Sequence, residues 1–259
     1  IGAGRMKNFL LSTGFAITLA YVGVCLYLFL SQRSFIYFPT ESAQADPAAS
    51  ATLSVSGASL QLSVRQHAGP DALIYFGGNA EDVSHSLAAF ADAFPDYAIY
   101  MLHYRGYGGS SGKPSETALH ADAHALFEMV SARHRNIVLV GRSLGSGIVV
   151  RLAATRPVSR IVLVTPYDSF VNLAKRQFPY VPVGLLLQDK YESWRYAPLI
   201  KTHTLILAAE NDEVIPREST LSLFGAFAPG VARMKVIAGV GHNSISSSPG
   251  YWSAMKTPE

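Results

Sequence analysis

The sequence predicts an α/β domain with a mostly parallel central sheet and helices on both faces, preceded by an N-terminal transmembrane helix. Short runs of aliphatic and aromatic residues recur between residues 72 and 238, and amphipathic helical stretches separate several of them. Near-continuous apolar strands that alternate with helices are typical of a parallel sheet covered on both faces. Before this region, residues 9–30 form one uncharged apolar run. The chain of 259 residues is long enough for a large domain in addition to such a helix.

The uncharged run at residues 9–30 reads "FLLSTGFAITLAYVGVCLYLFL". As a helix it would be about 33 Å long, at about 1.5 Å per residue, which is enough to cross a bilayer. A buried core helix is the alternative, but such a helix is rarely apolar on every face. Arg5 and Lys7 precede the run and Arg33 follows it. This bias favours a single-pass protein whose domain lies on the non-cytoplasmic side, which is the periplasm in a bacterium.

The apolar run also divides the chain into regions. We expect an N-terminal flank at residues 1–8, a transmembrane anchor at 9–30, a linker at 31–50 and one folded domain at 51–259. A cleaved signal peptide is the alternative to an anchor, because "SAQA" at residues 42–45 resembles a cleavage site. That site lies far beyond the apolar run, so we favour an uncleaved anchor.

Composition argues against several functions. The formal net charge is only +3 and no dense block of Lys and Arg occurs, so we expect no nucleic-acid partner. Cys25 is the only cysteine, which excludes an intrachain disulfide and a cysteine-based metal site. The segment "GGSSGKP" lacks the spacing of a phosphate-binding loop, and no His-Glu-x-x-His motif occurs. We therefore expect neither a metal nor a cofactor.

The folded domain is expected to contain a hairpin and six further strands. Residues 52–66 alternate apolar and polar side chains around Gly57, as a hairpin does. The further strands are expected at residues 72–76, 98–102, 136–140, 160–164, 204–208 and 234–238. Functional groups in such sheets collect at the carboxyl ends of the strands, so the residues that follow each strand are the candidates for a site.

The strand at residues 136–140 leads directly into Gly141-Arg142-Ser143-Leu144-Gly145 and then into a helical pattern. A Gly-x-Ser-x-Gly match alone is weak, because ordinary Gly and Ser usage produces it by chance. Between a strand and a helix, however, so tight a turn strains the Ser backbone, and the glycines remove side chains that would clash. The Ser hydroxyl is left exposed at the top of the sheet. A structural turn or a phosphate-binding loop is the alternative, and we predict that Ser143 is a nucleophile.

A serine nucleophile needs a base, and the base needs an acid that orients it. In this type of sheet the acid and then the His follow the Ser along the chain. His242 follows the last expected strand and is the predicted base, the alternative being a loop His without a role. Glu210, Asp212 and Glu213 follow the preceding strand, and we predict Asp212 as the acid because its short carboxylate can reach His242. Asp168 is the second choice, with a helix N-cap role as its alternative.

A tetrahedral acyl intermediate carries a negative oxygen that needs two N–H donors. The predicted donors are the backbone N–H of Leu144, directly after the Ser, and the backbone N–H of Asn79 in the loop "GGNAED". The two glycines of that loop allow it to lie close to a substrate. Asn79 could instead begin a helix as its N-cap, or serve both roles.

These residues lie in sequence blocks that resemble a known family. From about residue 33 to the C-terminus, the blocks "RSFIYFP", "GGNAED", "YRGYGGSSGKPSE", "GRSLGSG", "NDEVIP" and "GHN" resemble, in order, those of the small membrane-anchored alpha/beta-hydrolase-domain proteins. The resemblance implies the α/β-hydrolase fold with a minimal cap. It also implies a triad of Ser143, Asp212 and His242, with Asn79 and Leu144 as oxyanion donors.

The residues and the resemblance together favour a membrane-anchored serine hydrolase. We expect it to cleave carboxylic esters or thioesters through an acyl-enzyme, on small-molecule or lipid-like acyl substrates, because the anchor places it at a lipid surface. The aromatic-rich stretch within residues 166–203 forms either a small cap or ordinary helix packing, and we favour packing. The functional alternatives are an acyltransferase or peptidase with the same residues, and a membrane-tethered binding protein without chemistry.

Overall fold

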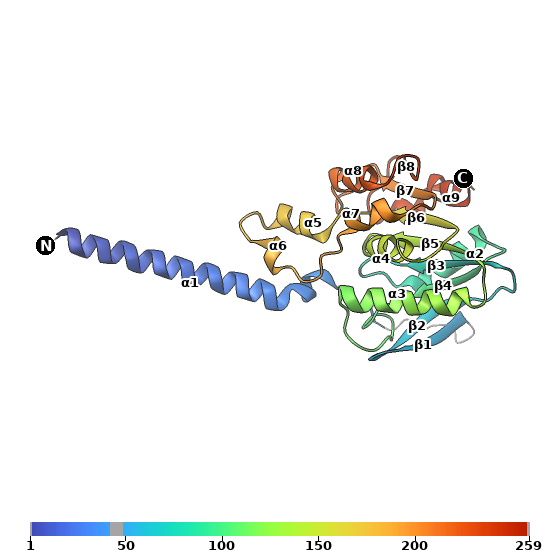
Figure 1. Ribbon diagram of the computed structural model, residues 1–259, viewed down its shortest axis with the longest axis horizontal. Helices are drawn as coiled ribbons and strands as arrows, with labels where there is room; N and C mark the ends of the chain where they lie inside the picture. The colour runs from blue at the N-terminus through green and yellow to red at the C-terminus, as the bar shows by residue number, and fades with distance from the viewer. Residues whose placement is uncertain (1, 42–48, 258–259) are drawn as a thin grey trace.

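An eight-stranded sheet is the centre of the computed structural model, which describes residues 2–41 and 49–257 (Figure 1). The strand order is β1-β2-β4-β3-β5-β6-β7-β8. β2 is antiparallel to both of its neighbours, whereas the other neighbouring strands are parallel. A mostly parallel sheet preceded by a long apolar helix is the fold class that the sequence predicts, and it is confirmed.

The strands coincide with the apolar runs of the sequence. Their bounds are β1 (Ser50–Val55), β2 (Ala58–Arg65), β3 (Asp71–Phe76), β4 (Ala98–Leu102), β5 (Asn136–Arg142), β6 (Arg160–Val164), β7 (Thr204–Ala209) and β8 (Ala232–Ile237). All residues of β4 are buried, because helices cover both faces of the sheet there. The hairpin between β1 and β2 turns at Gly57, whose φ of 74° lies in the left-handed region that favours glycine.

Most helices form two layers, one on each face of the sheet, whereas α5 and α6 lie toward α1 (Figure 1). Their bounds are η2 (Val83–Ser86), α2 (Leu87–Ala93), α3 (Glu116–Ser131), α4 (Leu144–Ala153), α5 (Phe170–Gln177), α6 (Val183–Leu186), α7 (Ser193–Tyr196), η3 (Ala197–Leu199), α8 (Arg217–Ala226), η4 (Ile245–Ser247) and α9 (Pro249–Lys256). Buried side chains of α3, α4 and α8 form one core cluster with the sheet. Buried side chains of α2 and α9 form a second cluster on the opposite face. The sheet therefore lies between two apolar layers.

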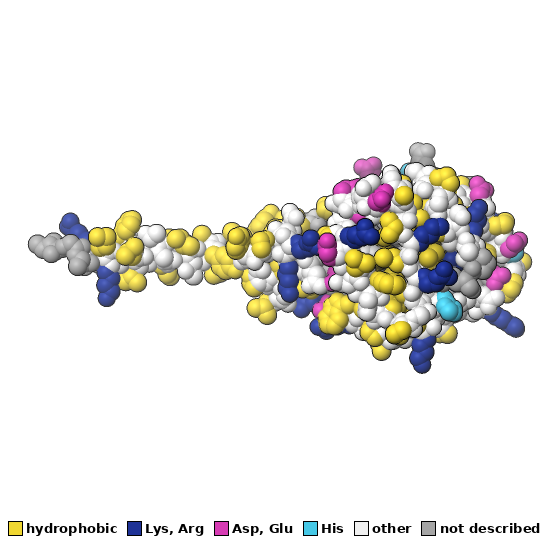
Figure 2. Space-filling view, turned by 90° about the horizontal axis from the view of Figure 1, so that it is seen from above, with side chains coloured by type: hydrophobic (Ala, Val, Ile, Leu, Met, Phe, Trp, Pro, Cys, Tyr) yellow, Lys and Arg dark blue, Asp and Glu magenta, His cyan; other side chains and the backbone are white. Residues whose placement is uncertain are grey.

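A long helix, α1 (Gly2–Ile36), precedes the domain and projects away from it (Figure 1). Its 35 residues correspond to about 52 Å. The stretch from Gly4 to Ile36 contains a window with a mean hydropathy of 2.0, none of which is buried inside the protein. Figure 2 shows hydrophobic side chains along most of this helix. By length and composition, α1 is able to cross a membrane.

The start of the expected linker is part of the packed structure. The helix does not end at residue 30 but continues to Ile36, and the next residue, Tyr37, is buried. The Tyr37 hydroxyl lies 2.9 Å from the Tyr191 hydroxyl and donates to Asp189 at 3.2 Å. The expected linker is therefore wrong for residues 31–37, because apolar side chains in "RSFIYFP" pack on the domain. Residues 42–48, which include the "SAQA" site, lie outside the described residues.

The stretch 166–203 divides into a part that packs on the domain, as favoured from the sequence, and a part that does not. Tyr191 is fully buried, and its ring packs against that of Phe170 with 4.8 Å between their centroids. This half packs on α4, as ordinary core packing does. Tyr180, by contrast, is 87% exposed. It belongs to a part of the stretch that lies beside α1 and not over the sheet (Figure 1).

Candidate active site

The turn between β5 and α4 holds Ser143 in a strained conformation. Its φ of 47° and ψ of −113° lie outside the backbone regions that residues other than glycine favour. Backbone strain of this kind is concentrated at functional sites. The flanking glycines make the turn possible, because a Cβ on Gly145 would lie 2.0 Å from the Phe76 carbonyl oxygen. The Ser143 N–H donates to the Val164 carbonyl at 2.9 Å, which ties the turn to β6. The sharp strand-to-helix turn predicted from the sequence is therefore present.

A chain of hydrogen bonds connects three side chains from different loops. The His242 Nε2 atom lies 3.0 Å from the Ser143 Oγ atom. On the other side of the ring, Nδ1 lies 2.9 Å and 3.0 Å from the two carboxylate oxygens of Asp212. Since a carboxylate can only accept, Nδ1 carries the proton and Nε2 is free to accept from the Ser hydroxyl. The structure thus brings together the three residues that the sequence predicts as nucleophile, base and acid.

The backbone of the β7–α8 loop fixes the Asp212 carboxylate. Its Oδ1 atom accepts from the N–H groups of Val214 at 3.0 Å and Ile215 at 2.7 Å. The neighbouring Glu213 accepts from the backbone N–H of His242 at 3.0 Å. This N–H lowers the pKa of the Glu213 carboxyl below its ordinary value. Glu213 therefore positions the loop that carries the His.

Asp168, the second choice for the acid, has different partners. Its carboxylate accepts from the Ser219 hydroxyl at 2.5 Å and from the Asn172 side-chain amide. The N-cap of α5 is the next residue, Ser169, whose hydroxyl accepts from the Asn172 N–H. Asp168 is therefore neither the partner of the His nor the N-cap, and the prediction of it as the second-choice acid is wrong. It joins the loop after β6 to α8.

The predicted oxyanion donors belong to α4 and to the loop after β3. Leu144 is the first residue of α4, so its N–H has no acceptor one helical turn before it. Asn79 lies in the loop after β3, and its side chain makes contacts that the sequence did not reveal. Its Oδ1 atom accepts from the Phe38 N–H at 3.0 Å and the Tyr107 hydroxyl at 2.7 Å, and its Nδ2 atom donates to the Ile36 carbonyl at 2.6 Å.

These contacts replace the helix-capping role that was the alternative for Asn79. The N-cap of η2 is Asp82, whose carboxylate accepts from the Ser84 N–H. The Asn79 side chain instead joins the loop to the end of α1. The backbone N–H of Asn79 makes none of these bonds, so its role as a donor to substrate stays a prediction.

Arg142 is a further residue of the site that sequence reasoning missed. Its guanidinium donates to Glu81 at 2.9 Å and to Asn243 at 3.1 Å, so it joins the loop after β3 to the loop that carries His242. Burial alone would lower the pKa of Arg142, but the nearby Glu81 carboxylate raises it above the ordinary value. Glu81 also accepts from the Gly78 N–H at 2.6 Å. Arg142 occupies a position of the Gly-x-Ser-x-Gly motif that any residue can fill, so the sequence did not indicate its ion pair with Glu81.

Among the described residues, no group of three or more His, Cys, Asp or Glu side chains is arranged to hold a metal ion. The polar side chains at the carboxyl edge are joined to one another instead. The Ser143 hydroxyl, the His242 imidazole and the Asp212 carboxylate are hydrogen-bonded in line. This arrangement is suited to nucleophilic attack on an acyl carbon.

Comparison with known proteins identifies the family. Residues 71–192 match the model described as alpha/beta hydrolase fold. The uncharacterized protein Rv2307c of Mycobacterium tuberculosis is 32% identical over 246 residues, which cover 88% of this chain and 86% of that protein. Protein bem46 of Schizosaccharomyces pombe is 26% identical over 196 residues, covering 71% of this chain and 65% of bem46. The chain belongs to the alpha/beta hydrolase fold family.

A solved structure shows the same fold. The esterase Pf2001 of Pyrococcus furiosus superposes with a TM-score of 0.65 at 14% identity, covering 84% of this chain and 93% of that one. At this identity the likeness concerns the fold alone. The superposition confirms the fold class that the sequence predicts.

Proposed function

We propose that this protein is a serine hydrolase that cleaves carboxylic ester or thioester bonds through an acyl-enzyme. The observation that carries the proposal is the hydrogen-bonded chain from Ser143 through His242 to Asp212, on a strained turn at the carboxyl edge of the sheet. A Ser hydroxyl is a weak nucleophile at neutral pH and needs such a base. A purely structural turn would need neither the strain nor the three partners in line.

The geometry supports the following steps. The Ser143 oxygen attacks the acyl carbon while His242 Nε2 takes the hydroxyl proton, and the Asp212 carboxylate stabilises the imidazolium that forms. The negative oxygen of the tetrahedral intermediate accepts from the N–H groups of Leu144 and Asn79. His242 then gives its proton to the leaving alcohol or thiol, and the acyl group stays on Ser143. Water, deprotonated by His242, releases the acid by the reverse sequence.

The length and composition of α1 support a membrane anchor as part of this function. The anchor would place the catalytic domain at a lipid surface, which favours acyl or lipid-like substrates over freely soluble ones. Because Arg5 and Lys7 precede the apolar run, we propose that the domain lies on the non-cytoplasmic side.

The experiment uses the full chain in detergent micelles with nitrophenyl esters of increasing acyl length. We expect hydrolysis by the natural sequence and a loss of about 10⁴-fold or more with Ser143→Ala. A preference for long chains would support the lipid-like class. Equal hydrolysis by both forms would overturn Ser143 as the nucleophile. No hydrolysis of any ester by the natural sequence would favour a binding protein on the hydrolase fold.

A further inference from the structure

The stretch between α5 and Gln188 is apolar, and six of its ten residues are exposed. Residues 178–187, hereafter the apolar segment, read "FPYVPVGLLL", include α6 and carry no charge. Tyr180 is 87% exposed and Leu185 is 86% exposed. Single exposed apolar side chains are ordinary on protein surfaces, but ten consecutive uncharged residues at a protruding tip are not.

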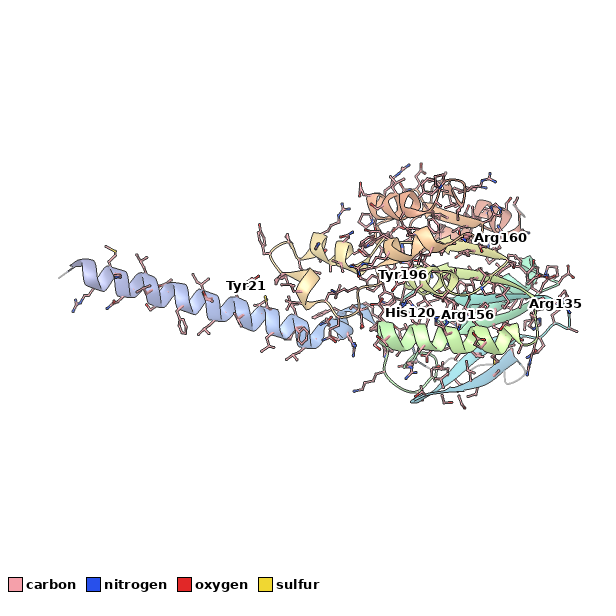
Figure 3. The ribbon with its side chains drawn as sticks, in the orientation of Figure 1. Tyr21, His120, Arg135, Arg156, Arg160 and Tyr196 are labelled. Carbon is pink, nitrogen blue, oxygen red and sulfur yellow. The ribbon has the colours of Figure 1, made fainter. Side chains whose placement is uncertain are left out.

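The apolar segment lies alongside the C-terminal half of α1 (Figure 1). The hydroxyl of Tyr21, labelled on α1 in Figure 3, donates to the Tyr180 carbonyl at 2.9 Å. A cavity of about 150 Å³ lies between the two elements. Its lining is almost entirely apolar, with Phe29 and Phe35 from α1 and Phe178 and Leu186 among the residues from the other side.

The two elements change from apolar to polar at the same level. The Gln32 side chain accepts from the Gln188 N–H at 2.7 Å and donates to the Leu186 carbonyl at 3.1 Å. One residue further along each element, the Arg33 guanidinium pairs with Asp189 at 3.0 Å. This polar level forms one boundary across both elements, as is expected where protein leaves a lipid bilayer.

The backbone of the apolar segment suits an environment without water. Pro179 and Pro182 have no N–H group, so the ten residues contain eight backbone donors. At least six of these eight, at residues 178, 181, 183, 185, 186 and 187, donate to carbonyls within the segment or α5. A loop with unpaired donors could not enter hydrocarbon, because each unpaired group costs several kcal/mol there. The segment largely avoids that cost.

Distances along α1 place the contact between Tyr21 and Tyr180 on the membrane side of the polar level. Tyr21 precedes Arg33 by 33 − 21 = 12 residues, which is about 18 Å of helix. The thickness of one leaflet with its headgroups is about 20 Å. If α1 is the anchor proposed above, the contact between Tyr21 and Tyr180 therefore lies within a leaflet. Lys175 precedes the segment, where anionic headgroups would attract its ammonium group, and Lys190 follows the segment and donates to the Gly184 carbonyl at 3.0 Å.

We propose that the apolar segment is embedded in the same membrane leaflet as the C-terminal half of α1, with lipid acyl chains as its partner. The protein is then held by two elements, a spanning helix and a shallower insertion, and the domain cannot rotate freely about the helix. The proposal rests on the membrane anchoring that forms part of the proposed function.

The test measures the depth of spin labels in the full chain, reconstituted in vesicles of phosphatidylcholine and phosphatidylglycerol. Cys25→Ser removes the only native thiol. Single cysteines then replace Leu185 in the apolar segment, Leu19 in α1, and Leu199 in η3, which is 60% exposed and serves as the matched control. For each label, collision with oxygen, which enters the bilayer, is compared with collision with a water-soluble nickel chelate.

We expect the label at residue 185 to resemble the label at residue 19, with a ratio of oxygen to nickel collisions severalfold above that at residue 199. A label at residue 185 that matches residue 199, while residue 19 reports hydrocarbon, would overturn the insertion and leave the anchor intact. A label at residue 19 that reports water would overturn the anchor and this proposal together. Hydrolysis of soluble esters is measured separately and does not depend on either outcome.

Discussion

Two neighbouring loops at the carboxyl edge of the sheet each carry an aspartate with a largely shielded side chain, and the two carboxylates differ in their partners. Asp168 follows β6 and binds the Ser219 hydroxyl and the Asn172 amide. Asp212 follows β7 and binds the imidazole of His242. Both side chains are nearly inaccessible to solvent. Burial after a strand therefore does not identify the acid of a triad, whereas the hydrogen-bonding partner does. Substitution of the two aspartates should therefore have different effects on activity and on stability.

The largest difference is expected in activity. Asp212→Asn should lower kcat on a nitrophenyl ester by about 10⁴-fold, because an amide cannot stabilise the imidazolium or hold the correct tautomer. Asp168→Asn is the matched control and should leave kcat within about tenfold of the natural value, since its carboxylate does not contact the His. The two measurements use the same substrate and detergent. Equal losses in the two variants would contradict the assignment of the acid.

Asp168 should affect stability more than activity. Asp168→Ala leaves the Ser219 hydroxyl and the Asn172 amide without their acceptor, at a cost of about 2 kcal/mol. For a chain of this size, that corresponds to a decrease in Tm of roughly 6 °C. Thermal unfolding in detergent, followed by circular dichroism, measures the change. A Tm that is unchanged in Asp168→Ala would show that this carboxylate does not hold the two elements together.

A third variant extends the comparison to the loop after β3. Asn79→Ala removes the side-chain bonds to Ile36, Phe38 and Tyr107, so the loop that carries the predicted donor loses its attachment to α1. We expect kcat to decrease by about tenfold with a smaller change in KM, because the transition state depends on the donor more than the substrate does.

Asn79→Asp is a near-isosteric second variant. It keeps the oxygen that accepts from Phe38 and Tyr107, but it places an acceptor against the Ile36 carbonyl and adds a negative charge beside the predicted oxyanion. We therefore expect it to lose at least as much of kcat as Asn79→Ala. If Asn79→Ala instead increased KM and left kcat unchanged, the loop would contribute to substrate binding and not specifically to the transition state.

The smallest effect is expected at Glu213. The His242 N–H lowers the pKa of this carboxyl, so the ionised form is favoured in the folded protein. Its contribution to stability is then present at neutral pH and is lost as the pH falls through the lowered pKa. Glu213→Gln should show a small decrease in Tm at pH 7 that disappears in acid. A decrease that is equal at pH 7 and in strong acid would exclude the carboxylate as its cause.

Much of the fold followed from the sequence, because its signals are local. The runs "NIVLV" and "RIVLV" are apolar on both faces, and the structure confirms each as a buried strand. The proximity of Ser143, Asp212 and His242 could be predicted as well. Each follows a strand, and parallel strands bring their carboxyl ends to one edge.

The parts that could not be predicted depend on pairs of residues that are distant in sequence. The bond of Asn79 to Ile36 and that of Arg142 to Glu81 join segments whose own patterns indicate only a loop or a helix end. The choice between Asp168 and Asp212 depended on which loop faces His242, which the offset from each strand did not decide. The end of the predicted anchor was missed because "RSFIYFP" continues the helix and then packs on the domain.

Covalent labelling tests most directly whether His242 and Asp212 make Ser143 nucleophilic. A fluorophosphonate reacts with an activated Ser oxygen, forming a P–O bond and releasing fluoride, and peptide mass spectrometry locates the adduct. We predict one adduct, on Ser143, that forms at the natural rate in Asp168→Asn and far more slowly in Asp212→Asn. An adduct on another residue, or equal rates in the two variants, would contradict the claim.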